Sequence, residues 1–175
     1  MIRVRLFRRG GVSSEALSAL GVQRRDHVIA SARTTDGRWV VATSDNLIVG
    51  PSTDSDSEST RRLPWDRIGA ASWRDDALEV SVSFPRRQPE RMVLRFDEPE
   101  RLPEAVRDRV TSSIVVNEHV RIDGRLGVRI VGRRRPAQQA LIWTLAFDRG
   151  LDPDDPWIRG RAEEELERLR EMTGS

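Results

Sequence analysis

The segment from Arg61 to Phe84 (RRLPWDRIGAASWRDDALEVSVSF) constrains the fold more than any other part of the chain. From Leu78 to Phe84 every second side chain is apolar, and the residues between them are Glu or Ser. This two-residue period predicts a β-strand with one buried face and one solvent-facing face. Polar residues at Asp66-Arg67 and from Arg74 to Asp76 interrupt the segment, so it predicts three consecutive strands joined by tight connections.

Similar patterns on both sides extend the β-structure. An Asp36-Gly37 dipeptide between two apolar runs is a hairpin signal. A short helix is expected before them over 15–20, capped by Ser13 or Ser14 and ended by Gly21. Counting from His27 gives about seven short antiparallel strands, over 27–33, 39–43 and 47–49, within the 61–84 segment, and over 91–96.

An amphipathic helix follows the seventh strand. Leu102, Val106 and Val110 recur every four residues, and Pro103 suits the first helical turn. Beyond it, apolar segments over 113–122, 127–133 and 141–147 predict three more strands. A last helix is expected after Asp155, which is a suitable N-cap residue.

The local text RWVVATSDNLIVG, RRLPWDRIGAASW and ALEVSVSF resembles the bacterial pleckstrin-homology-like (PH-like) domains over residues about 24–112. The resemblance implies an antiparallel β-barrel of about seven strands, capped by a C-terminal helix. Lipid-binding members of the wider family hold phosphoinositides with basic residues on the loop between the first two strands. Here that loop is Thr34–Arg38, with only Arg33 and Arg38 nearby, so the resemblance implies a protein or peptide ligand and not a phosphoinositide.

The expected fold is therefore mainly β (α+β), in three parts. Residues 1–23 form an N-terminal arm and short helix, and residues 24–112 form the PH-like barrel with its capping helix. Residues 113–175 form a β-β-β-α extension. About sixty residues are marginal for independent folding, so we expect this extension to pack on the barrel.

Composition excludes several classes of function. The chain of 175 residues has no cysteine, and all of its 30 basic residues are Arg, against 28 acidic residues. Disulfides, thiolate nucleophiles and cysteine-containing zinc sites are thus excluded, as is the lysine-containing phosphate loop of many ATPases. The longest uncharged run, Pro136–Phe147, is too short to cross a bilayer. We expect a cytoplasmic, non-catalytic protein without a cofactor.

No metal site is expected either. The only histidines, His27 and His119, lie on different predicted strands. Residues 54–58 imitate the start of a calcium-binding loop, but the glycine needed for its turn is missing and the twelfth position is Trp65 instead of Glu.

Candidate binding residues fall into two groups. Exposed arginines on predicted turns can contact phosphates or acidic partners, but they can equally be solvated turn residues. Tryptophans beside a turn or at a helix entry can seal the fold or anchor a partner. The candidates are Arg86, Arg87, Arg133, Arg134, Arg135, Trp65 and Trp157. The leading hypothesis is a binding or scaffold module that recognises a protein or peptide through a sheet edge or barrel groove. The alternative is an accessory nucleic-acid-binding protein that uses the Arg-rich turns.

Overall fold

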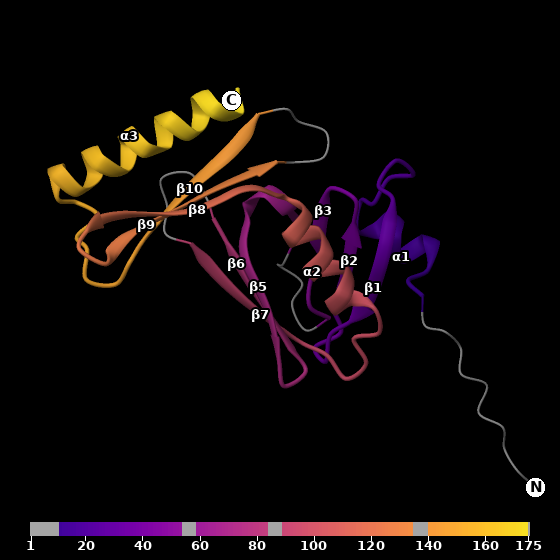
Figure 1. Cartoon of the computed structure of the whole chain (residues 1–175). Helices are drawn as coiled ribbons and strands as arrows, with labels where there is room; N and C mark the ends of the chain where they lie inside the picture. Colours follow the sequence, from indigo (N-terminus) through magenta and orange to yellow (C-terminus); the bar gives the residue numbers. More distant parts are fainter. Residues whose placement is uncertain (1–10, 54–58, 84–88, 135–139, 175) are drawn as a thin grey trace, which may run out of the picture.

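The computed structural model describes residues 11–53, 59–83, 89–134 and 140–174. Within these ranges the chain forms three antiparallel sheets and three α-helices, so the predicted mainly β class is confirmed. Figure 1 shows the first seven strands on one side of the molecule, and the last three strands with the final helix on the other. The first ten residues of the predicted N-terminal arm lie outside the described residues, and so do residues 54–58, which imitate the start of a calcium-binding loop.

The first seven strands divide between two sheets. One sheet has the order β1-β2-β3-β4 and the other the order β5-β6-β7. The strands of the first sheet are β1 (Val28–Arg33), β2 (Trp39–Thr43), β3 (Asn46–Val49) and β4 (Arg61–Pro64). Those of the second are β5 (Ile68–Arg74), β6 (Ala77–Val82) and β7 (Glu90–Arg95). Buried side chains from both sheets form one hydrophobic core.

The prediction of a single seven-stranded barrel is wrong, because these sheets do not close. A short 3-10 helix, η1 (Trp65–Arg67), carries the chain from β4 to β5, and the pairing of β5 with β6 is irregular between Ile68 and Ala70. Consecutive strands β4 and β5 therefore enter different sheets instead of pairing. On the opposite side, one isolated bridge between Thr34 and Phe96 links the two sheets within the described residues.

Helix α2 (Leu102–Ser112) covers the core shared by the two sheets. Leu102, Ala105 and Val106 are buried, as the four-residue period predicted. At the other end of the molecule, α1 (Ser14–Ala19) has the predicted cap, since the Ser13 hydroxyl accepts a hydrogen bond from the Ala16 amide. Gly21 follows it with φ of +68°, a conformation that favours glycine.

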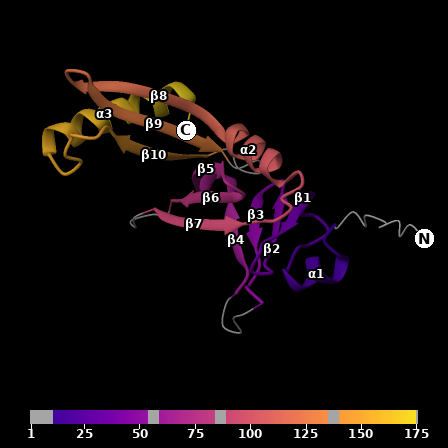
Figure 2. The ribbon, with the colours of Figure 1, turned by 90° about the horizontal axis from the view of Figure 1, so that it is seen from below.

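The last part of the chain forms its own sheet and helix. Strands β8 (Ile114–Asp123), β9 (Leu126–Arg134) and β10 (Leu141–Phe147) pair in the order β10-β9-β8. Helix α3 (Pro156–Thr173) lies along this sheet, and its Ala162 and Leu169 form a small core with Val128 and Ile130 of β9. Figure 2 shows the sheet and α3 as a layer beside β5–β7, with α2 near the junction.

Two hydrogen bonds to one carboxylate fix the end of β10. Asp148 accepts a hydrogen bond from the Gly127 amide at 2.8 Å, and its Oδ2 lies 2.8 Å from His119 Nε2. The contact with His119, followed by that with Gly127, lowers the pKa of Asp148 below the ordinary value of 3.8. This group connects β8, β9 and the segment after β10.

The carboxylate of Asp148 is expected to stabilise the fold near neutral pH and to lose this effect in acid. Its pKa is lower in the folded chain than in the unfolded chain, so its stabilisation is present above the unfolded pKa and lost as the pH falls through the folded one. Urea denaturation of Asp148→Asn should show lower stability than the natural chain at neutral pH, and equal stability in acid below the folded pKa. Asp108→Asn, on the exposed side of α2, is the control. If Asp148→Asn remained less stable than the natural chain in acid, the stabilisation could not be assigned to the charged Asp148 carboxylate.

Among the described residues, no helix is both long and apolar enough to cross a membrane.

Candidate functional site

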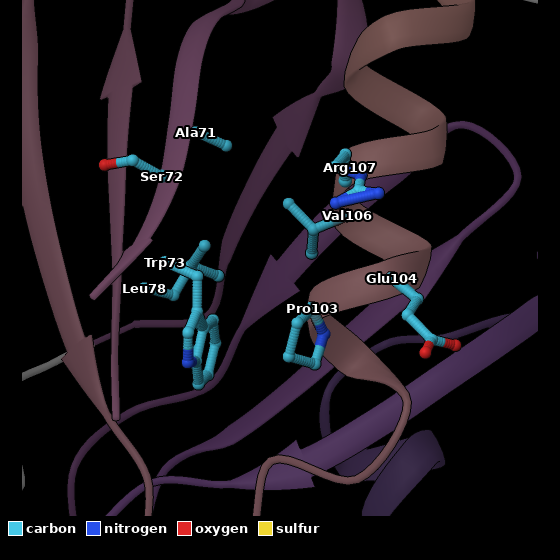
Figure 3. A pocket seen from close by; sticks show the side chains of 8 residues that line it. All are labelled: Ala71, Ser72, Trp73, Leu78, Pro103, Glu104, Val106 and Arg107. Atoms are coloured by element: carbon cyan, nitrogen blue, oxygen red, sulfur yellow. The ribbon is translucent and has the colours of Figure 1, made fainter. Parts of the chain in front are cut away.

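A groove lies between α2 and the edge of the second sheet. Its volume is about 260 Å³, and Figure 3 shows its lining. Trp73 of β5 and Leu78 of β6 form the strand side, and Pro103 and Val106 of α2 form the helix side. The walls are therefore mainly apolar.

The sequence of β5 explains why a groove forms here. From Gly69 to Ser72 the strand carries only small side chains, so little fills the space between its edge and α2. Trp73 then closes one end, where its ring packs against Phe96 with centroids 5.3 Å apart. On the helix side, the first turn of α2 presents the rigid ring of Pro103.

The outer edge of β5 is open. The sheet order β5-β6-β7 places this strand at the end of its sheet, and no other strand of the described chain pairs with it there. Apart from the Gly69 carbonyl, which accepts a hydrogen bond from Arg133, the backbone groups on this unpaired edge are available to another extended chain. The segment 69–73 contains no proline and no charged side chain, which are common means of protecting an edge.

Charged residues flank the groove but do not enter its apolar part. Glu104 and Arg107 are both exposed, and Glu104 points away from the strands (Figure 3). The described residues contain no group of three or more His, Asp or Glu side chains arranged to hold a metal ion. The chemistry of the groove is thus that of a recognition surface with an apolar floor and one charge of each sign at its rim.

The two tryptophan candidates have different environments. Trp65 is 1% exposed, and its indole Nε1 donates a hydrogen bond to the Thr43 carbonyl at 2.9 Å, so its ring is largely part of the core. Trp157 is 58% exposed at the start of α3. A partner-anchoring role for Trp157 stays a prediction.

The arginine candidates also differ in how far they are buried. Arg133 does not lie at an exposed turn as predicted, because β9 extends to Arg134 and turns the Arg133 side chain inward, where it is 5% exposed. Burial lowers the pKa of Arg133. Arg134 is exposed, and Arg86, Arg87 and Arg135 lie outside the described residues.

Arg133 connects the C-terminal sheet to the rest of the molecule. Its guanidinium donates hydrogen bonds to the Val110 carbonyl at 3.0 Å, the Ser113 hydroxyl at 2.8 Å and the Gly69 carbonyl at 2.8 Å. These acceptors belong to the end of α2 and the start of β5. We refer to this set of contacts as the Arg133 junction.

The groove was not identified from the sequence, which pointed only to an unspecified edge or groove. Its walls come from β5, β6 and α2, elements separated in the chain and brought together by the fold. The available signals were the small residues of β5 and the proline at the start of α2, and neither indicates that the two are neighbours.

No family model matches the chain, and neither the curated proteins nor the solved structures contain a significant match to it.

Proposed function

We propose that the protein is a non-catalytic binding module that recognises an extended peptide segment of a protein partner in the groove between β5 and α2. The observation that carries the proposal is the coincidence of an unpaired strand edge with an apolar groove beside it. An extended peptide adds to such an edge through main-chain hydrogen bonds, and pockets beside it select the side chains.

The groove favours a particular kind of peptide. Its volume of about 260 Å³ and its walls of Trp73, Leu78 and Val106 suit one large apolar side chain. In a strand, alternate side chains point to the same face, so the neighbours of that residue face solvent and contribute less. Glu104 and Arg107 at the rim favour a peptide with charges of both signs near its apolar anchor.

We further propose that residues about 24–112 are a PH-like module. The support is the order of elements, with seven antiparallel strands followed by a helix that covers their common core. A phosphoinositide ligand at the β1–β2 loop is disfavoured. Arg33 Nε donates to the Gly37 carbonyl at 3.1 Å, and Arg38 Nε pairs with Asp36 at 2.7 Å.

Selection of random displayed peptides on the full-length protein tests the main proposal. The affinities of the selected peptides are then measured by fluorescence polarisation on three proteins: the natural chain, Ala71→Arg and Ala70→Arg. Ala71 lines the groove, whereas Ala70 is its exposed neighbour on the opposite face of β5. We expect Ala71→Arg to weaken binding about tenfold or more, because the added side chain occupies the anchor position.

Ala70→Arg is the matched control, since it adds the same side chain to the same strand. It should bind the selected peptides as the natural chain does, and thermal denaturation verifies that both variants fold. Equal affinities for all three proteins would show that the groove is not the binding site. Failure to select any peptide would contradict peptide recognition itself.

A further inference from the structure

A second pocket, of about 330 Å³, lies where the carboxyl end of α2 meets both the first sheet and the C-terminal sheet. It is separate from the groove described above, and the two share no lining residue. Binding sites occur preferentially at such junctions between structural units. The lining comes from the β2–β3 turn, η1, the last turn of α2, β8 and β9, through Ser44, Trp65, Arg109, Ser112, Ser113, Val115 and Arg134.

The pocket is positively charged. Arg109 and Arg134 both line it, and the described residues of its lining include no carboxylate. Neither guanidinium forms an ion pair or hydrogen bond with another described side chain. Three acidic residues adjoin lining residues in the sequence: Asp45 follows Ser44, Asp66 follows Trp65 and Asp108 precedes Arg109. None of the three lines the pocket. Two arginines that line one cavity, with no carboxylate among its described lining residues, repel each other, and an anion between them would relieve that repulsion.

The end of a helix is normally unfavourable for an anion, because its free carbonyls carry partial negative charge. Here donors from within the protein bind the free carbonyls of the last turn of α2 and reduce their partial negative charge. Arg133 Nη1 and the Ser113 hydroxyl donate to the Val110 carbonyl at 3.0 and 2.7 Å. The Ser112 hydroxyl donates to the Arg109 carbonyl at 3.1 Å. The Arg133 junction thus places a third positive charge beside the pocket and reduces the opposing helix dipole.

We propose that this pocket binds a phosphate monoester. One arginine can satisfy the two oxygens of a carboxylate, but a phosphate monoester has a charge near −2 and three acceptor oxygens, which suit two guanidinium groups. The Ser44 hydroxyl, which also lines the pocket, already donates to Asp45 Oδ2 at 3.4 Å. The volume corresponds to about ten water molecules, so a phosphate group fits with the first atoms of the group that carries it. Val115, which is 45% exposed, provides apolar contact for those atoms.

Isothermal titration calorimetry of the full-length protein tests this inference. The probes are inorganic phosphate, glycerol 3-phosphate and a short phosphoserine peptide, together with the unphosphorylated peptide. We expect binding of the phosphorylated probes to weaken about tenfold or more in Arg109→Gln and in Arg134→Gln, since each loses a charge-assisted contact. Arg125→Gln, at the exposed β8–β9 turn, removes the same charge elsewhere and should bind as the natural chain does.

The probes also distinguish the source of the phosphate. Tighter binding of glycerol 3-phosphate than of the peptide indicates a small molecule, and the reverse indicates a phosphorylated partner; both support the site. Absence of binding by all three phosphorylated probes overturns the proposal, as does equal binding by Arg109→Gln, Arg134→Gln and the natural chain. A single-stranded oligonucleotide that binds more tightly than all three, with a salt dependence reduced by Arg134→Gln, overturns it in favour of nucleic acid. This test does not depend on peptide binding at the groove.

Discussion

Replacement of Arg133 by methionine is expected to lower the free energy of unfolding by about 2–4 kcal/mol, because it removes three hydrogen bonds that a charged donor makes to buried or partly buried acceptors. Arg133 is 5% exposed and donates to Val110, Ser113 and Gly69. Methionine has a similar length and an apolar end, so the cavity stays largely filled. The Gly69 carbonyl loses its bond to Arg133, whereas the Val110 carbonyl retains the Ser113 hydroxyl.

The neighbouring Arg134→Met is the matched control. The side chain of Arg134 is exposed, and surface substitutions of this kind usually change stability by less than about 0.5 kcal/mol. Urea denaturation followed by both tryptophan fluorescence and circular dichroism measures the two variants. Similar stabilities for Arg133→Met and Arg134→Met would show that the Arg133 junction contributes little. Two separate transitions in Arg133→Met alone would show that the junction couples the C-terminal sheet to the rest.

Gly127→Ala is expected to destabilise the C-terminal sheet by about 3 kcal/mol, at the upper end of the usual cost of overpacking. A Cβ atom at position 127 would lie 2.1 Å from the Val120 carbonyl oxygen and 2.9 Å from the His119 ring. The first of these neighbours is backbone, so β8 and β9 would have to separate at this point. The same shift would disturb the hydrogen bond from the Gly127 amide to Asp148.

Gly160→Ala is the control, and it is expected to raise the stability of the protein instead of lowering it. Gly160 lies within α3, and a Cβ atom there would meet nothing within 4 Å. Alanine is the better helix former by about 0.5–1 kcal/mol, so this substitution should stabilise the protein. Chemical denaturation compares the two variants directly. A Gly127→Ala protein as stable as the natural chain would contradict the close approach of β8 and β9.

Local patterns were sufficient to locate most helices and strands. The expected strands over 39–43 and 141–147 coincide with β2 and β10, and Asp155 caps α3 through the Trp157 and Ile158 amides. Alternation and capping depend on residues close together in the chain, so a single sequence contains that information. The partition into sheets depends instead on how η1 directs the chain, and the two-residue period does not specify which strands pair.

The environment of individual arginines and tryptophans was harder to predict. Arg133, Arg134 and Arg135 are consecutive and identical in type, but a strand turns neighbouring side chains to opposite faces. Once β9 extends to residue 134, Arg133 faces inward and Arg134 outward. The same applies to Trp65 and Trp157, whose burial depends on what packs against them and not on their neighbours in sequence.

The Arg133 junction has a consequence for how the chain can be divided into fragments. A fragment that ends after Ser112 would contain all seven strands of the first two sheets and the whole of α2, and by its sequence would look complete. It would nevertheless lack the Arg133 side chain, which donates hydrogen bonds to the Val110 and Gly69 carbonyls. The C-terminal sheet thus supplies a cap for a helix that precedes it in the chain. Expression fragments, domain transplants and deletion series should keep residues up to the end of β9 together with the segment from β1 to α2.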